Sequence, residues 1–291
     1  MSTSKILENL KTDPKQLLLQ GLEMRWENYR TELKNCRDEF TEDAVHDLRV
    51  ATRRILALIQ LLNSISPHPR LKKMSRAFKD QLDEFDDLRD TQVILAELST
   101  ILQELPQLDE FEQRLRSHEK QMLQDLHRKL KQRDTSEVAR WIRKTQDALE
   151  EKTESELHTQ ILDAVDDAFL DVRQRLAWVD LARSATIHRV RVVFKAFRYM
   201  VEIVNPLVKD FPPALLKQMN EYQTLMGNIQ DAEVFGRILA DFAASAPFPG
   251  QEAVQHYYEK RRNEAISAFA GSMDQLHTFW RPAPDQPFPW D

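Results

Sequence analysis

Apolar residues recur along this chain with the period of an amphipathic α-helix. In 45–58 and 187–200 they return every three or four positions, with charged residues between them. This period is typical of helices that turn one face to a core. Prolines fall mainly between such stretches, where they end helices. We predict helices over 14–33, 42–65, 68–104 (two helices that meet near 86–90), 106–133, 135–141, 156–182, 184–204, 213–227, 230–245 and 250–278.

Glycine is scarce in the sequence. The chain has 291 residues and 5 glycines, whereas average usage would give about 20. Hairpins and phosphate-binding loops rely on glycine for turns and for close backbone approach. The scarcity disfavours β-sandwich, Rossmann and P-loop folds, so that an all-α fold is expected.

Two parts of the sequence resemble each other in the same order. At an offset of 142, His46 aligns with His188 and Arg49 with Arg191; at an offset of 141, 88–94 aligns with 229–235. Ordered similarity over several helices predicts two homologous halves related by a pseudo-two-fold axis. The predicted division is a single domain over 10–278, made of a first half (10–133), a connecting helix (134–155) and a second half (156–278). A proline-rich, extended tail (279–291) follows, and the sequence leaves open whether its Phe288 and Trp290 dock on the body.

The formal net charge of −6 disfavours a dedicated nucleic-acid binder, but it conceals strong segregation. Residues 45–80 hold eight basic side chains against two acidic ones, and 183–200 hold five basic side chains and no acid. Residues 81–113 hold ten acids against Arg89 alone. An acidic total therefore coexists with one basic block in each half.

The basic residues lie on one face of each helix. His188, Arg191, Lys195 and Arg198 stand at positions i, i+3, i+7 and i+10, which share a face. The opposite face is apolar. Since stacked like charges repel, the row favours binding of an external polyanion. The alternative is that the acidic block over 81–113 folds over the row.

Asp90 and Asp231 each follow a predicted helix break, the second at Gly227-Asn228. We expect each to be an N-cap or a first-turn acid, which the helix dipole favours. The alternative is that each orients a basic side chain of its own half.

These motifs resemble those of the CHAD family, the conserved histidine α-helical domain. VHDLRVATRR (45–54) and IHRVRVVFKAFRY (187–199) are similar to its helix with a histidine three residues before Arg-Val and further bases beyond. LRDTQV (88–93) and IQDAEV (229–234) are similar to its Asp-centred element. Two positions depart from the family pattern. Leu56 stands where a further basic residue is usual, and Ala196 stands in the second copy where a basic residue would match Arg54.

The resemblance implies two four-helix-bundle halves around a central basic groove or pore. It also implies binding of inorganic polyphosphate and association with polyphosphate granules. Cations about 5.4 Å apart along a helix can track such a chain, and protonation of the histidines would strengthen binding as pH falls. The candidate polyphosphate-binding residues are His46, Arg49, Arg53, Arg54, Lys72, Lys73, Arg76, Lys79, His188, Arg191, Lys195, Arg198 and Lys217.

Other functions stay open. His46-Asp47 suits an HD-type metal site of a phosphohydrolase, but the second copy reads His188-Arg189, so we expect neither catalysis nor a metal or other cofactor. RNA binding would need aromatic stacking, and Tyr199 alone lies near the basic face. A protein adaptor would use the acidic block instead.

The remaining features concern location. The single Cys36 excludes an internal disulfide and a cysteine-based zinc site. No uncharged apolar run of 18 residues occurs, and the first residues lack the apolar segment of a signal peptide. We therefore expect a cytoplasmic protein that does not enter a membrane.

Overall fold

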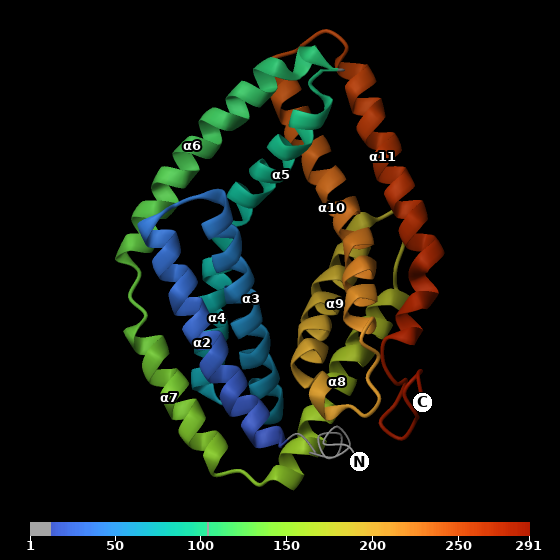
Figure 1. Cartoon of the computed structure of the whole chain (residues 1–291). Helices are drawn as coiled ribbons and strands as arrows, with labels where there is room; N and C mark the ends of the chain where they lie inside the picture. The colour runs from blue at the N-terminus through green and yellow to red at the C-terminus, as the bar shows by residue number, and fades with distance from the viewer. Residues whose placement is uncertain (1–12, 104) are drawn as a thin grey trace, which may run out of the picture.

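The computed structural model describes residues 13–103 and 105–291, which are folded into α-helices and short 3-10 helices with no β-strand among them (Figure 1). The predicted all-α class is confirmed, while the first residues of the predicted domain, 10–12, lie outside the described part. The helices are α2 (Pro14–Asp38), α3 (Glu42–Ile65), α4 (Pro69–Asp83), α5 (Asp86–Ile101), η1 (Pro106–Leu108), α6 (Asp109–Gln132), α7 (Ser136–Glu150), α8 (Glu154–Ala177), α9 (Ser184–Val204), η2 (Asn205–Leu207), α10 (Leu215–Ser245), α11 (Gln251–Ser272) and η3 (Met273–Thr278).

Local sequence explains where the first helices begin. The Asp13 carboxylate accepts hydrogen bonds from the backbone N–H groups of Lys15 and Gln16, at 2.7 and 3.2 Å, with Pro14 at the first helical position. Thr41 caps α3 in the same way by accepting from the N–H of Ala44 at 3.2 Å. Both predicted starts are confirmed.

The predicted helix break at Gly227-Asn228 is wrong, because α10 continues through it. A glycine within a helix costs about 1 kcal/mol, and tertiary packing outweighs that cost here. Tyr222, Met226 and Ile229 are buried on either side of the glycine, and α10 contacts both α9 and α11.

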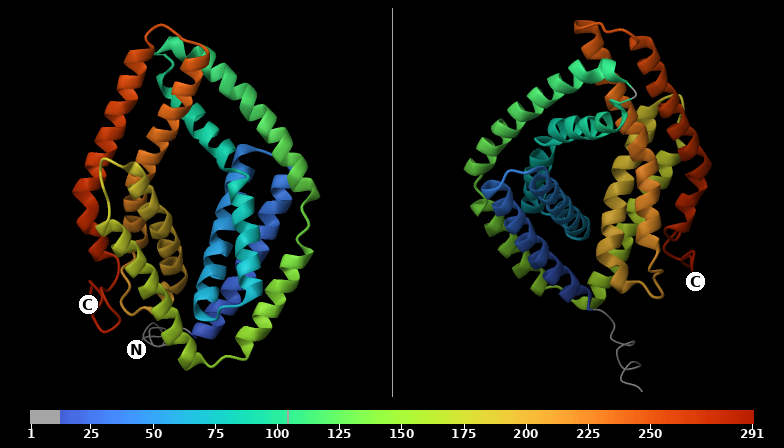
Figure 2. Two further views of the ribbon diagram at one scale, coloured as in Figure 1. Left: turned by 180° about the vertical axis from the view of Figure 1, so that it is seen from behind. Right: turned by 45° about the horizontal axis from the view of Figure 1, so that its top comes forward.

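The helices form two groups that meet in two separate apolar cores. The larger core spans the α2–α4 group and the α8–α9 group, with α3 in contact with both α8 and α9. The smaller core lies where α5 and α6 meet α10 and α11, at the top of Figure 1 and of its reverse view in Figure 2. The pseudo-two-fold relation and the division into halves stay predictions.

The C-terminal segment has no regular helix and is packed against the body, with Phe288 and Trp290 in contact with the larger core, which answers the docking question that the sequence left open. Phe279 and Trp280 are fully buried, and the Trp280 indole N–H donates to the Asp166 carboxylate at 2.7 Å. Arg281 donates to the same carboxylate at 3.0 and 2.5 Å. Further on, Phe288 stacks on Trp290, with ring centroids 4.9 Å apart. One buried carboxylate thus anchors the segment.

Among the described residues, no helix has an apolar stretch long enough to cross a bilayer. The long helices carry charges on their surfaces. Helix α9, for example, carries Arg189, Arg191, Lys195, Arg198 and Glu202.

We expect Asp166→Ala to lower the free energy of unfolding by about 2–4 kcal/mol, because it leaves the Trp280 N–H and the Arg281 guanidinium without their acceptor. Urea denaturation measures the change. The exposed neighbour Asp167 provides the control, and an equal loss in Asp167→Ala would contradict the anchoring role of Asp166.

Candidate functional site

Helices α3 and α9 pack against each other and bring their basic residues together. Each helix places two cations four residues, or about one turn, apart. A fifth cation comes from α5, and these side chains act on one another electrostatically. We call this group the cation cluster; it consists of Arg49, Arg53, Arg89, Arg191 and Lys195.

Arg89 joins the two groups of helices. Its Nη1 atom lies 2.9 Å from a carboxylate oxygen of Asp231 on α10 and 3.0 Å from one of Asp90 on its own helix. Burial alone would lower the pKa of Arg89, but these two carboxylates raise it above its ordinary value. The guanidinium is therefore a fixed positive charge that bridges α5 and α10.

The same contacts correct the expected capping role of Asp90 and Asp231. Asp90 lies more than a turn inside α5, and Asp231 lies in the middle of α10. The alternative, that each acid orients a base of its own half, holds for Asp90 alone. Asp231 binds Arg89 from the other group of helices.

Arg49 is held by the protein itself. Its side chain is 5% exposed, and its guanidinium lies 3.1 Å from the Asp86 carboxylate and donates to the Leu82 carbonyl at 3.4 Å. Burial lowers the pKa of Arg49, and Asp86 opposes that shift. Here the acidic block does fold over part of the basic row.

Arg53, Arg191 and Lys195 make no ion pair within the part of the chain that the structure describes. Burial and the neighbouring Arg49 lower the pKa of Arg53 to about 10. Burial, followed by Arg53 and Arg191, lowers the pKa of Lys195 to about 6. Burial lowers the pKa of Arg191 as well, and its Nε atom is buried without a hydrogen-bond partner. An added anion would stabilise the charged form of all three side chains.

Two further basic residues, Arg54 on α3 and Arg198 on α9, are neutralised in part. Arg54 lies 3.4 Å from Glu202, and Arg198 lies 3.8 Å from the same carboxylate. Arg198 also donates to Gln223 at 3.0 Å and covers the ring of Tyr199. Arg54 and Arg198 therefore extend the basic surface across α3 and α9, but they offer less free positive charge than the cation cluster does.

His46 and His188 lie three residues before Arg49 and Arg191, so each borders the cation cluster. Both are exposed, and neither side chain hydrogen-bonds within the described residues. Within 13–103 and 105–291, no group of three or more His, Cys, Asp or Glu side chains is placed to hold a metal ion.

The predicted residues outside α3 and α9 lie elsewhere on the surface. The Nζ of Lys73 is 5.9 Å from the ring centroid of Trp141 on α7, and Lys217 lies 3.8 Å from Glu221. The structure does not bring these side chains into the cation cluster, and their part in binding stays a prediction. The exposed members of this set are Lys72, Lys73, Arg76, Lys79 and Lys217.

The candidate list from the sequence lacked Arg89 and its acidic partners. A signal was present: Arg89 is the single base among ten acids in 81–113 and stands next to Asp90, in a segment that aligns with the one around Asp231. Sequence alone gives no contact between 89 and 231, because the contact depends on how α5 and α10 meet.

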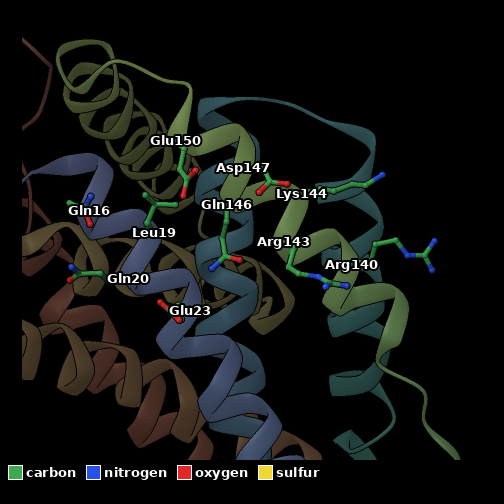
Figure 3. Close-up of a pocket in the computed structure, with 10 residues that line it drawn as sticks. All are labelled: Gln16, Leu19, Gln20, Glu23, Arg140, Arg143, Lys144, Gln146, Asp147 and Glu150. Atoms are coloured by element: carbon green, nitrogen blue, oxygen red, sulfur yellow. The ribbon is translucent and has the colours of Figure 1, made fainter.

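A groove of about 670 Å³ lies between α2 and α7 (Figure 3). Its charges are balanced, so it suits a polyanion less well than the cation cluster does. Its charged residues are Glu23, Asp147 and Glu150 against Arg140, Arg143 and Lys144.

Comparisons with known proteins agree with this architecture. The family model described as "CHAD domain" matches residues 21–240, which include the whole cation cluster. The crystal structure of the CHAD domain from the plant Ricinus communis is similar over 90% of each chain, with a TM-score of 0.67 and 19% sequence identity. At this identity the likeness shows the fold alone. A search of curated proteins finds no match.

The pKa of Lys195 gives a prediction for stability. Since its folded value of about 6 lies below the ordinary lysine value near 10.4, the unfolded chain binds more protons between these limits. The resulting destabilisation is complete below about pH 6 and vanishes as pH rises toward 10.4. We therefore expect Lys195→Met to stabilise the unliganded protein more at pH 6 than at pH 10, as measured by urea denaturation.

The control for this prediction is Lys217→Met, which alters an exposed lysine on α10. The same pH-dependent gain in both variants would show that burial within the cation cluster is not the cause.

Proposed function

The chain belongs to the CHAD domain family, and on that premise we propose that it binds inorganic polyphosphate at the cation cluster without catalysing a reaction on it. The observation that carries the proposal is the partly buried trio of Arg53, Arg191 and Lys195, which lack an ionic partner among the described residues. The proposed setting is the cytoplasm, with association with polyphosphate granules.

The chemistry of the cluster suits phosphate oxygens. A guanidinium presents two parallel donors to a phosphate, and an ammonium acts as a point charge. Gathering like charges in a partly desolvated place is unfavourable, so an arriving anion relieves repulsion as well as forming hydrogen bonds. The repulsion present in the empty protein thus adds to the free energy gained when an anion binds.

The shape of the row suits an extended chain of phosphates. On α9, Arg191, Lys195 and Arg198 follow one another about one turn apart, and His188 extends the row at its start. On the neighbouring α3, Arg53 lies within the electrostatic reach of Lys195. A flexible polyanion can lie along α9 while it contacts α3.

The cluster offers little that would read a nucleic-acid base. Tyr199, the aromatic residue that acts on Arg53, is covered by the Arg198 guanidinium, which leaves less of its face for base stacking. Contacts to phosphate alone carry no base information. Inorganic polyphosphate therefore fits better than RNA.

We expect the double variant Arg53→Gln/Arg191→Gln to bind polyphosphate about 100-fold more weakly than the unaltered protein. Each substitution removes a charge-assisted contact of about 1.5 kcal/mol. Isothermal titration calorimetry at a fixed salt concentration measures the affinity. The matched control is Arg189→Gln/Lys209→Gln, which removes two exposed charges.

Three further readouts use the same samples. Affinity should fall steeply with salt, as expected for counterion release, and RNA of matched charge should bind more weakly. Polyphosphate incubated with the protein and Mg²⁺ should keep its length on a gel. A flat salt response, tighter RNA binding or shortened chains would each contradict the corresponding part of the proposal.

We expect binding to tighten as pH falls from 8 to 6, because bound phosphate raises the pKa of Lys195 from about 6 in the empty protein and a proton is taken up. One linked proton changes affinity by up to about tenfold per pH unit. Titrations in two buffers of different ionisation enthalpy measure the uptake.

Lys195→Met should remove that part of the pH response, while His46→Gln and His188→Gln report the share of the histidines. Equal affinity at pH 6 and pH 8 in the unaltered protein would show that no titrating group takes part.

A further inference from the structure

Gly227 lies within α10 beside the side chain of Arg191. A Cβ atom at this position would lie 3.8 Å from the Arg191 Nε atom. That Nε atom is buried and has no hydrogen-bond partner within the described residues. Arg191 therefore lies against a position of α10 that has no side chain to pair with it.

The first half of the chain holds the aligned arginine in a different way. At the offset of 142, Arg49 aligns with Arg191, and at the offset of 141, Asp86 aligns with Gly227. In the structure, the Asp86 carboxylate lies 3.1 Å from the Arg49 guanidinium. The aligned positions thus meet in both copies, with an ion pair in the first copy and a glycine in the second.

The neighbouring turns of α10 hold two other arginines by direct contact. One turn before the glycine, Gln223 accepts a hydrogen bond from Arg198 at 3.0 Å. One turn after it, the Asp231 carboxylate lies 2.9 Å from the Arg89 guanidinium. Residues four apart lie on the same side of a helix. Gly227 is therefore a gap between two positions that each bind an arginine.

We propose that Gly227 keeps Arg191 available to a bound polyanion, because it withholds the carboxylate that neutralises the aligned arginine of the first half. This inference rests on the proposed function, and it makes Gly227 a positioning residue that acts through Arg191. A glycine inside a helix is less stable than an alanine, and a buried nitrogen without a partner is unfavourable as well. Both unfavourable features occur at one contact, as is common where a binding site reduces stability.

The consequence is that the two aligned arginines have different tasks. Arg49 already has Asp86 as its partner and contributes mainly to the fold. Arg191 lacks such a partner, so a phosphate oxygen can supply the negative charge that Asp86 supplies in the first half. A polyanion therefore gains more from the arginine on α9 than from its counterpart on α3.

The test replaces Gly227 by aspartate, which reproduces the residue pair of the first half. We expect Gly227→Asp to bind polyphosphate about tenfold more weakly, because its carboxylate engages Arg191 and the ligand loses one charge-assisted contact. The salt dependence of binding should also be shallower, since fewer counterions are released. Isothermal titration calorimetry at several salt concentrations measures both. Unchanged affinity and salt dependence would overturn the proposal.

Two further variants separate charge from volume. Gly227→Asn has nearly the shape of Gly227→Asp but no charge. Gly227→Ala adds only the Cβ atom, which at 3.8 Å from Arg191 makes an ordinary van der Waals contact. Both variants should keep most of the affinity for polyphosphate. A loss in either variant as large as that in Gly227→Asp would show that the glycine provides space alone, which contradicts the proposal.

Gly236 provides a matched control on the same helix. It stands nine residues after Gly227, on the opposite side of α10, and among the described residues no atom lies within 4 Å of a Cβ placed there. Gly236→Asp changes the net charge by the same amount, and its affinity should stay close to that of the unaltered protein. An equal loss in Gly227→Asp and Gly236→Asp would indicate a general effect of net charge and would overturn the local role.

Stability distinguishes a new ion pair from a damaged fold. Gly227→Asp should have a folding equilibrium constant about tenfold above that of Gly227→Asn, although it binds polyphosphate more weakly, whereas a damaged fold would lower both quantities. The gain should vanish when Arg191→Gln is added, which a double-mutant cycle in urea measures. A gain that persists with Arg191→Gln would contradict the contact between the two positions.

The same measurements separate this inference from the proposed function. Loss of affinity in Arg53→Gln/Arg191→Gln, but not in Gly227→Asp, would overturn the role of Gly227 and leave polyphosphate binding at the cation cluster standing. If the urea cycle detects the new pair but neither variant loses affinity, polyphosphate binding at this place is contradicted, and the role of Gly227 falls with it. Loss of affinity in both variants, together with the pair in the cycle, would support both proposals.

Discussion

The crowding of five basic side chains, four of them arginines, in a partly buried place is the constraint on which this structure depends. Three carboxylates offset part of the repulsion, with Asp86 beside Arg49 and with Asp90 and Asp231 beside Arg89. The apolar contacts of two separate cores hold the helices that carry these groups. The cluster is therefore a region of electrostatic repulsion that well-packed helices hold in place, which is a common arrangement for a binding site.

The neutralisation is selective, and the selection divides the cluster into two parts. Arg89 joins α5 to α10, and Arg49 is buried against Asp86, so both contribute mainly to shape. Arg53 and Arg191 are left to carry net positive charge toward a ligand, and Lys195 is left to take up a proton beside them when the ligand binds. A protein that paired every cation with its own carboxylates would be more stable but would bind an anion more weakly. Such a trade-off between stability and binding is common.

The sequence predicted the parts of this arrangement that depend on local spacing. The Asp13 cap, the ends of α3 and α9 and the basic face of each helix follow from residues within a few positions of one another. The salt bridge from Arg89 to Asp231 joins residues 142 positions apart, and no local pattern encodes it. The continuity of α10 through Gly227 and the burial of Trp280 depend likewise on packing between distant segments.

The presence of one lysine among four arginines has a physical reason. Even with a lowered pKa, the guanidinium of Arg53 titrates only at about 10 and remains charged at neutral pH. Lys195, at about 6, loses its proton when the site is empty and regains it when an anion arrives. A fifth arginine would add permanent repulsion to the empty protein. The lysine adds positive charge when ligand is present and relieves repulsion when it is absent, which makes position 195 the place where pH can act on the site.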